Sequence, residues 1–221
     1  MSELQTLLEA CRQRDVAVFV IGGFGVRAYG SLLRRTLDLD LAIAATTWPA
    51  LTEVLKVQGY HLASAGIWAT AAKGEGAEAI EIHIAVGDVV DVQSAAHYPV
   101  GIDPGVRRRL PDSDIVLPVF TLEGLLITKL MALRDNDVVD IAALLVQHAG
   151  QVDPWRFWNQ GEEARLKILL KDRLAELEEI LQSEEVNAIW WDRLGLMLDD
   201  DERCTALDVV HRLQRSAKPQ F

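Results

Sequence analysis

Two aspartates in the segment Thr36-Leu37-Asp38-Leu39-Asp40-Leu41 have the type and spacing of a metal-binding pair. In a strand, successive side chains point to opposite faces, so Asp38 and Asp40 share one face with Cα atoms roughly 6.5 Å apart. Two carboxylates on one face repel each other unless a cation lies between them. Hard cations such as Mg²⁺ bind one or two carboxylates together with substrate phosphates. The pair therefore predicts a magnesium site for a phosphate-bearing substrate.

A glycine pair upstream could bind that phosphate. The apolar run 16–21 predicts a buried strand that ends at Gly22-Gly23, where a helix begins. Because glycine has no side chain, the backbone there can approach a phosphate closely, and a helix N-terminus favours anions. A lone Gly-Gly or a lone Asp-x-Asp is more often structural. Here the Gly-Gly and Asp-x-Asp motifs occur together, in this order, after a hydrophobic strand and before an apolar one. Together they predict metal-assisted nucleotidyl transfer.

Such chemistry often uses a third carboxylate, which completes the metal site and takes the proton of the attacking hydroxyl. Asp91, flanked by valines in Val89-Val90-Asp91-Val92, is the first candidate. Glu81 has the same pattern one predicted strand earlier and is the competitor. For both acids the structural alternative is a polar residue on the exposed face of a sheet. His83 shares the face of Glu81 and is expected to be a half-buried strand histidine.

A lysine in an otherwise apolar helix could supply positive charge. Lys129 lies in the helix predicted to begin at Thr121, and downstream of it Arg134, Asp137 and Asp140 recur three residues apart. Those spacings suit a helical salt-bridge ladder, which is the preferred interpretation when they are taken alone. They also suit the orientation of a phosphate-binding lysine.

Composition limits the classes of partner. The chain has 221 residues, 50% of them hydrophobic and 25% charged, with a net charge of −11. This composition is typical of a globular protein, and its acidity disfavours bulk binding of polyanions. Two basic clusters, Arg34-Arg35 and Arg107-Arg108-Arg109, could still face a phosphate. Cys11 and Cys204 indicate neither a disulfide framework nor a zinc site. With no signal-peptide pattern and no apolar run of about 20 residues, the expected location is cytoplasmic.

The pattern along the chain predicts two domains. Residues 1–150 alternate between helical and strand-like segments, whereas residues 151–221 are helical throughout, with leucines at helical spacing over 162–182. The predicted fold class is α+β: a mixed sheet flanked by helices, followed by a helical C-terminal appendage.

These motifs together resemble a known family. Ile21-Gly22-Gly23-Phe24-Gly25-Val26-Arg27-Ala28-Tyr29-Gly30 and then Arg35-Thr36-Leu37-Asp38-Leu39-Asp40-Leu41 resemble the nucleotidyltransferase superfamily with the polymerase-β-like core. More narrowly, the chain is similar to bacterial AbiEii-type and MenT-type toxins. The resemblance covers about residues 16–146. It departs from the superfamily pattern at Gly23, where serine is frequent, and at Tyr29, where histidine is frequent.

The resemblance implies transfer of a nucleoside monophosphate from a nucleoside triphosphate (NTP) to an acceptor, with release of pyrophosphate. It implies three acids as Mg²⁺ ligands and catalytic residues: Asp38, Asp40 and Asp91. It also implies six nucleotide-binding residues: Gly22, Gly23, Arg27, Arg35, Thr36 and Lys129.

The sequence leaves three alternatives for the function: two classes of acceptor and a protein without catalytic activity. Toxin-type members indicate RNA, such as a tRNA end. The charge of −11 favours a small cationic acceptor, such as an aminoglycoside or a lincosamide. A third hypothesis is a catalytically silent NTP-binding module whose C-terminal helices, with Trp190-Trp191, bind a partner protein.

Overall fold

The computed structural model describes residues 3–30, 38–63, 67–76, 79–111 and 113–217. The described residues up to Phe120 form one compact unit, and those from Thr121 onward form a second.

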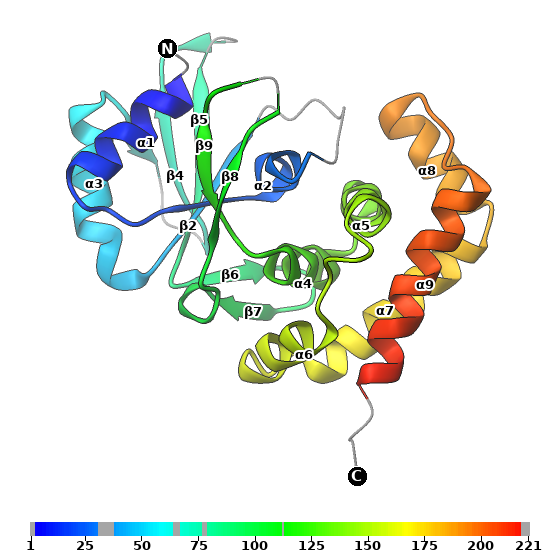
Figure 1. The fold of residues 1–221 in the computed structure, drawn as a ribbon. Coiled ribbons are helices and arrows are strands. Elements are labelled where there is room, and N and C mark those ends of the chain that lie inside the picture. Colours follow the sequence, from blue (N-terminus) through cyan, green and yellow to red (C-terminus); the bar gives the residue numbers. More distant parts are fainter. Residues whose placement is uncertain (1–2, 31–37, 64–66, 77–78, 112, 218–221) are drawn as a thin grey trace. The chain divides into compact units, whose positions relative to one another are not determined.

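The first unit is built on a mixed sheet of seven strands among its described residues (Figure 1). In spatial order these are β3 (His61–Ala63), β4 (Ala69–Lys73), β5 (Ile80–Val86), β2 (Leu39–Ile43), β1 (Phe19–Ile21), β9 (Val116–Val119) and β8 (Val106–Arg109). The pairs β2–β5 and β1–β9 are parallel, and the other neighbours are antiparallel. Strands β6 (Asp88–Asp91) and β7 (Ala96–Pro99) pair separately as an antiparallel ribbon.

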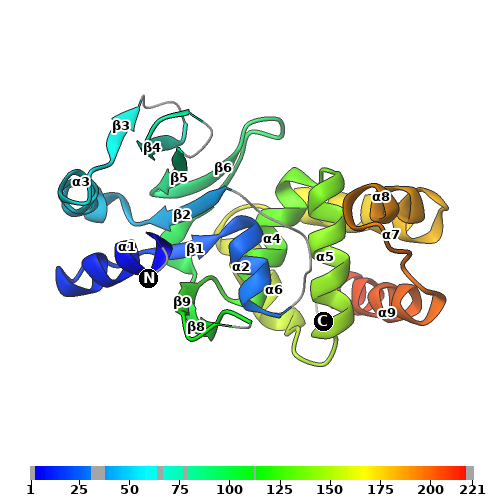
Figure 2. The same ribbon diagram turned by 90° about the horizontal axis from the view of Figure 1, so that it is seen from above.

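Helices cover both faces of this sheet. α1 (Glu3–Gln13) and α3 (Trp48–Val57) contact each other on one face, and α2 (Gly22–Ala28) lies on the other (Figures 1 and 2). Two short 3₁₀ turns, Ala45–Thr47 and Val100–Ile102, complete the unit. α3 shows why such a helix forms: Pro49 fits its first turn, and Leu51, Val54 and Leu55 make one buried face at spacings of three and four residues.

In the second unit, every regular element among the described residues is a helix (Figure 2). These are α4 (Leu122–Ala132), α5 (Asp135–Gln147), α6 (Pro154–Glu163), α7 (Lys167–Gln182), α8 (Glu185–Leu194) and α9 (Asp200–Ser216). The hydroxyl of Thr121 accepts a hydrogen bond from the Gly124 N–H and so caps α4. Four leucines of α7 form the predicted helical stripe and are buried: Leu170, Leu174, Leu177 and Leu181.

The compact units divide at Phe120–Thr121, earlier than the boundary expected near residue 150. The physical reason is that α4 and α5 pack on each other and on later helices: α4 contacts α6 and α7, and α5 contacts α8 and α9. Their apolar side chains are therefore buried in the core of the helical unit. Sequence periodicity shows that a helix is apolar, but does not show which neighbour covers it.

The predicted fold class is confirmed: a mixed sheet flanked by helices, with a set of helices at the C-terminal end. None of the helices in the described part of the chain has both the length and the hydrophobicity that crossing a membrane requires.

Candidate active site

The glycine turn and Asp40 are brought together by strand pairing. β1 and β2 are antiparallel, with Ile21 opposite Asp40, so Gly22 follows β1 at the level of this carboxylate. Gly22 has φ +60°, in the left-handed region that favours glycine. A Cβ atom on Gly22 would overlap Oδ2 of Asp40 and would lie 2.9 Å from its Cγ. The carboxylate therefore lies directly against the first residue of α2, and only glycine leaves room for it.

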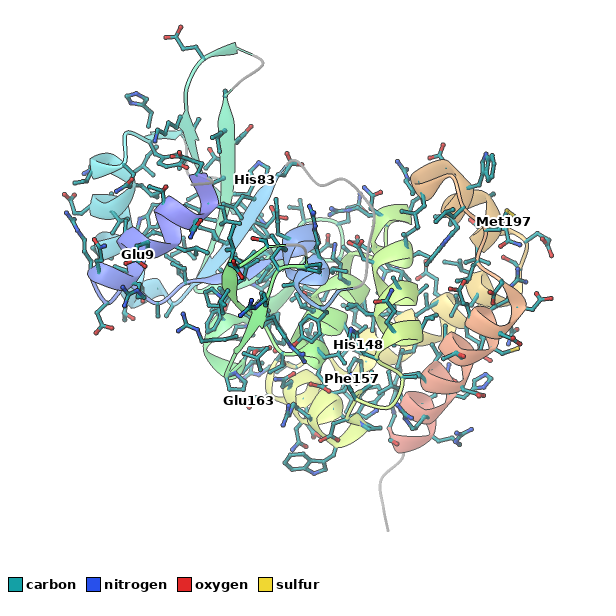
Figure 3. All side chains as sticks on the ribbon, turned by 45° about the horizontal axis from the view of Figure 1, so that its top comes forward. Glu9, His83, His148, Phe157, Glu163 and Met197 are labelled. Carbon is teal, nitrogen blue, oxygen red and sulfur yellow. The ribbon has the colours of Figure 1, made fainter. Side chains whose placement is uncertain are left out.

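A histidine lies on the other side of the Asp40 carboxylate. β2 and β5 are parallel, and their register pairs Asp40 with His83. The Nδ1 atom of His83 is 3.3 Å from Oδ1 of Asp40, and its Nε2 atom is 3.5 Å from Oε1 of Glu81. Glu81 and His83, two residues apart on β5, share one face as the sequence predicted. The two nitrogens of the imidazole thus face two different carboxylates. Figure 3 labels His83.

Sequence reasoning found His83 as a half-buried strand histidine, and its side chain is 35% exposed. It missed the contact with Asp40, because that contact depends on β5 lying beside β2. The signal available in the sequence was the shared face of Glu81 and His83, which did not identify the neighbouring strand.

Asp38 is the residue immediately before β2, and it is exposed. Its neighbour Leu39 pairs with Ile82, the residue that follows Glu81. Asp38 and Glu81 therefore each lie one residue before a paired position on neighbouring parallel strands. The N-terminal ends of β2 and β5 therefore lie side by side.

Asp91, the first candidate for the third carboxylate, is held in its own turn. It is the last residue of β6 and is 5% exposed, and its Oδ2 accepts hydrogen bonds of 2.7 Å from both the N–H and the hydroxyl of Ser94. These bonds close the turn between β6 and β7. Glu81 is 59% exposed and is linked to Asp40 through His83, so the geometry favours Glu81 as the third carboxylate.

Of the predicted nucleotide-binding residues, Gly22 and Gly23 begin α2, and Arg27 lies one turn further on the same face as Gly23. The side chain of Arg27 is half-exposed and forms no ion pair with a carboxylate of the described ranges. Its charge is therefore not neutralised by a described carboxylate. Arg35 and Thr36 lie outside the described residues.

Lys129 belongs to the second unit, where it joins α4 to α5. Its Nζ atom is 2.7 Å from Oδ1 of Asp137 and 2.8 Å from Oδ2 of Asp140, and its side chain is 13% exposed. Burial acts to lower the pKa of Lys129, but the charges and hydrogen bonds of Asp140 and Asp137 outweigh burial, and the pKa is raised. These ion pairs join two helices, unlike the ladder along one helix that the spacing suggested, and nucleotide binding by Lys129 stays a prediction.

A divalent cation such as Mg²⁺ requires several oxygen ligands. Within the described ranges, no group of three or more His, Cys, Asp and Glu side chains is arranged to hold a metal ion. The oxygens of Asp38 and Asp40 are nevertheless the hard donors that Mg²⁺ prefers, and Mg²⁺ in such sites takes its other ligands from substrate phosphates and water. The residues fit a cation that binds together with its nucleotide.

A cavity of about 740 Å³ lies elsewhere in the first unit, between α1, the segment entering β1, and β8–β9. Its walls include Leu8, Cys11, Phe19, Arg107 and Val116. None of the predicted site residues lines it. Gly22 and Asp40 lie at the other end of β1, so this cavity is separate from the candidate active site.

Comparison with known proteins supports the same class of protein. A family model of aminoglycoside-2''-adenylyltransferase matches residues 3–104, just under half of the chain. The matched span contains the glycine turn and four of the acids: Asp38, Asp40, Glu81 and Asp91. A search of curated proteins gives no match.

Two solved structures share the fold at low sequence identity, and a third is similar over about two thirds of this chain. A Helicobacter pylori protein assigned to the nucleotidyltransferases has a TM-score of 0.51 and 12% identity, covering 98% of this chain and 97% of its own. JHP933 from Helicobacter pylori has a TM-score of 0.50 and 12% identity, covering 98% and 94%. The lincosamide antibiotic adenylyltransferase LnuA, solved with lincomycin, has a TM-score of 0.48 and 18% identity, covering 65% and 96%.

The fold, the acids at the glycine turn and the family match over residues 3–104 support the class that the sequence predicted, a nucleotidyltransferase enzyme. The narrower resemblance to AbiEii-type and MenT-type toxins is not shown by these comparisons.

Proposed function

We propose that the chain transfers a nucleoside monophosphate from a Mg²⁺-bound NTP to a hydroxyl group of a small polycationic acceptor of the aminoglycoside class. The observation that carries this proposal is the aminoglycoside-2''-adenylyltransferase match over residues 3–104, which spans the candidate active site. The net charge of −11 supports it, because an acidic protein attracts a polycation and repels a polyanion. The cytoplasm, where NTP and Mg²⁺ are abundant, is the proposed location.

In this proposal each residue at the site has one role. Asp38 and Asp40 hold Mg²⁺, which when bound neutralises phosphate charge and orients the phosphates. The backbone of Gly22-Gly23 and the guanidinium of Arg27 bind the phosphates of the NTP. Glu81 accepts the proton of the acceptor hydroxyl as its oxygen bonds to the α-phosphorus. The bond from the α-phosphorus to the bridging oxygen then breaks, and pyrophosphate leaves with that oxygen.

Label transfer tests the proposal. The protein is incubated with Mg²⁺ and each α-labelled NTP in turn, with an aminoglycoside panel, with lincosamides, or with total RNA. We expect label in an aminoglycoside, and a loss of at least about 100-fold in Asp40→Asn, because the metal-binding charge is removed. The melting temperature of the variant is measured in parallel, so that loss of activity is separated from loss of fold.

The other acceptors are distinct outcomes of this assay. Label in RNA alone would replace the aminoglycoside with the acceptor of toxin-type members. No label in any acceptor, with NTP still bound, would leave a binding module whose C-terminal helices contact a partner protein.

Two matched variants test whether Glu81 or Asp91 is the third carboxylate. We expect Glu81→Gln to lower kcat by about 100-fold with little change in stability, because a general base contributes on that order and this side chain is exposed. We expect Asp91→Asn to cost about 1–3 kcal/mol of stability, because the turn to Ser94 loses a charged acceptor, with a smaller effect on kcat. Steady-state rates and urea unfolding measure both; a reversed pattern would assign the role to Asp91.

A further inference from the structure

The two oxygens of the Asp40 carboxylate face different neighbours. Oδ2 lies against Gly22, in the space that a Cβ atom would occupy. Oδ1 faces Nδ1 of His83 at 3.3 Å. A rotation of the carboxylate about its Cβ–Cγ bond would therefore change both contacts at once. The glycine backbone limits the position on one side, and the imidazole provides a polar partner on the other.

The surroundings of His83 show what the imidazole can do there. Asp40 faces it from β2, and Glu81 faces it from its own strand. On β4 its partner in the register is Thr70, whose hydroxyl donates to the carbonyl of Ala63. With the proton on Nδ1, His83 donates to Asp40, and its other nitrogen faces Glu81. The two ring nitrogens thus face two different carboxylates.

We infer that His83 is a positioning residue: it fixes the orientation of the Asp40 carboxylate toward the bound cation and keeps Glu81 at a set distance from it. This inference rests on the proposed function, because it assigns Asp40 to a metal. The physical basis is general, since groups that hydrogen-bond a metal-ligating carboxylate fix its orientation, and their loss costs about 10–100-fold in metal affinity or activity.

The chain contains a matched control for His83. On the β6–β7 ribbon, Nδ1 of His97 lies 3.3 Å from Oδ2 of Asp88, the same atom types at the same distance. His97 and Asp88 have no role in the proposed site. Removing the imidazole at His97 therefore reports the cost of losing a strand histidine–aspartate contact by itself.

Metal binding is measured apart from turnover. Mn²⁺ replaces Mg²⁺ as the probe, and its binding to the full chain with a non-hydrolysable NTP analogue is followed by electron paramagnetic resonance. We expect His83→Ala to raise the Kd for Mn²⁺ by about 10–100-fold and to lower kcat by a similar factor, with KM for the acceptor nearly unchanged. His97→Ala is expected to match the wild type.

Conservative variants test the role of each ring nitrogen. The side-chain amide of asparagine reaches about the position of Nδ1, whereas that of glutamine reaches about the position of Nε2. We expect His83→Asn to restore most of the Mn²⁺ affinity and His83→Gln to restore less. This comparison decides the inference even if His83→Ala fails to fold, since both variants keep a polar side chain.

Unchanged Mn²⁺ affinity in His83→Ala, or an equal loss in His97→Ala, would overturn the inference, as would a wild-type chain that binds no Mn²⁺. Failure of the proposed function gives a different result: Mn²⁺ binding stays sensitive to His83 while no acceptor receives label.

Discussion

At the scale of single residues, the site depends on one position where a side chain does not fit. Gly22 combines a positive φ with the direct approach of the Asp40 carboxylate, so two separate constraints favour glycine there. The sequence supplied the first reason to notice Gly22, as a flexible turn beside a phosphate. The structure adds the second, since the carboxylate occupies the space of the missing Cβ.

The effect of replacing Gly22 on stability and metal binding therefore depends on the Asp40 carboxylate beside it. We expect Gly22→Ala to lower stability by about 1–3 kcal/mol and to raise the Kd for Mn²⁺, because Asp40 must move. Gly195→Ala is the control. Gly195 has φ +66° with nothing within 4 Å of an added Cβ, so this variant has the backbone strain without a clash. Urea unfolding and Mn²⁺ titration compare the two. Equal losses of stability with unchanged Mn²⁺ binding would contradict the contact with Asp40.

At the scale of elements, a buried ion cluster joins two helices of the second unit. Lys129 on α4 lies between Asp137 and Asp140 on α5, and Asp140 is fully buried. The sequence placed these acids on one helix and suggested a ladder with Arg134. The two ion pairs instead run between helices, because α4 and α5 pack side by side. Removing the lysine would leave two carboxylates in the core without its charge.

We expect Lys129→Met to cost about 3–5 kcal/mol, the usual result of removing one partner of a buried ion pair. The control is Lys56→Met, which removes an exposed pair with Glu53 and should cost less than about 1 kcal/mol. Urea unfolding at neutral pH measures both. A loss at Lys129 no larger than at Lys56 would contradict a structural role of the cluster.

The same cluster predicts a pH dependence with a defined sign. The pKa of Lys129 is raised in the folded chain, so its contribution to stability is fully present below the unfolded pKa of about 10.4 and is lost as pH rises through the folded pKa. The stability difference between wild type and Lys129→Met should be constant from neutral pH to about pH 9.5 and should shrink at higher pH. Urea unfolding across this range checks the trend, and a difference that grows with pH would have the wrong sign.

At the scale of the whole molecule, the net charge of −11 bears on the acceptor. Long-range attraction between an acidic protein and a polycation weakens as salt screens it. We expect kcat/KM for an aminoglycoside to fall on the order of tenfold between about 0.05 and 0.5 M salt. The KM for NTP, an anion, should stay constant or fall over the same range. A rate with the aminoglycoside that is flat or rises with salt would contradict electrostatic attraction of the acceptor.

The sequence by itself determined the class of enzyme and the elements that carry its chemistry. The strand before Gly22-Gly23, the alternation around Asp38 and Asp40, and the helical leucines of 162–182 follow from local periodicity and from the conformational freedom of glycine. The nature of the acids and their spacing pointed to a divalent cation and a phosphate. These are properties of short segments, which the sequence encodes directly.

Only the tertiary structure decided which residues meet. Asp40 and Glu81 both face His83 because β5 pairs with β2, and Asp91 is held by Ser94 because β6 turns back into β7. Likewise α4 and α5 belong to the helical unit because their apolar faces are covered by later helices. The physical reason is the same in each case: strand partners and helix neighbours are chosen by packing between segments far apart in the chain, and no local pattern specifies them.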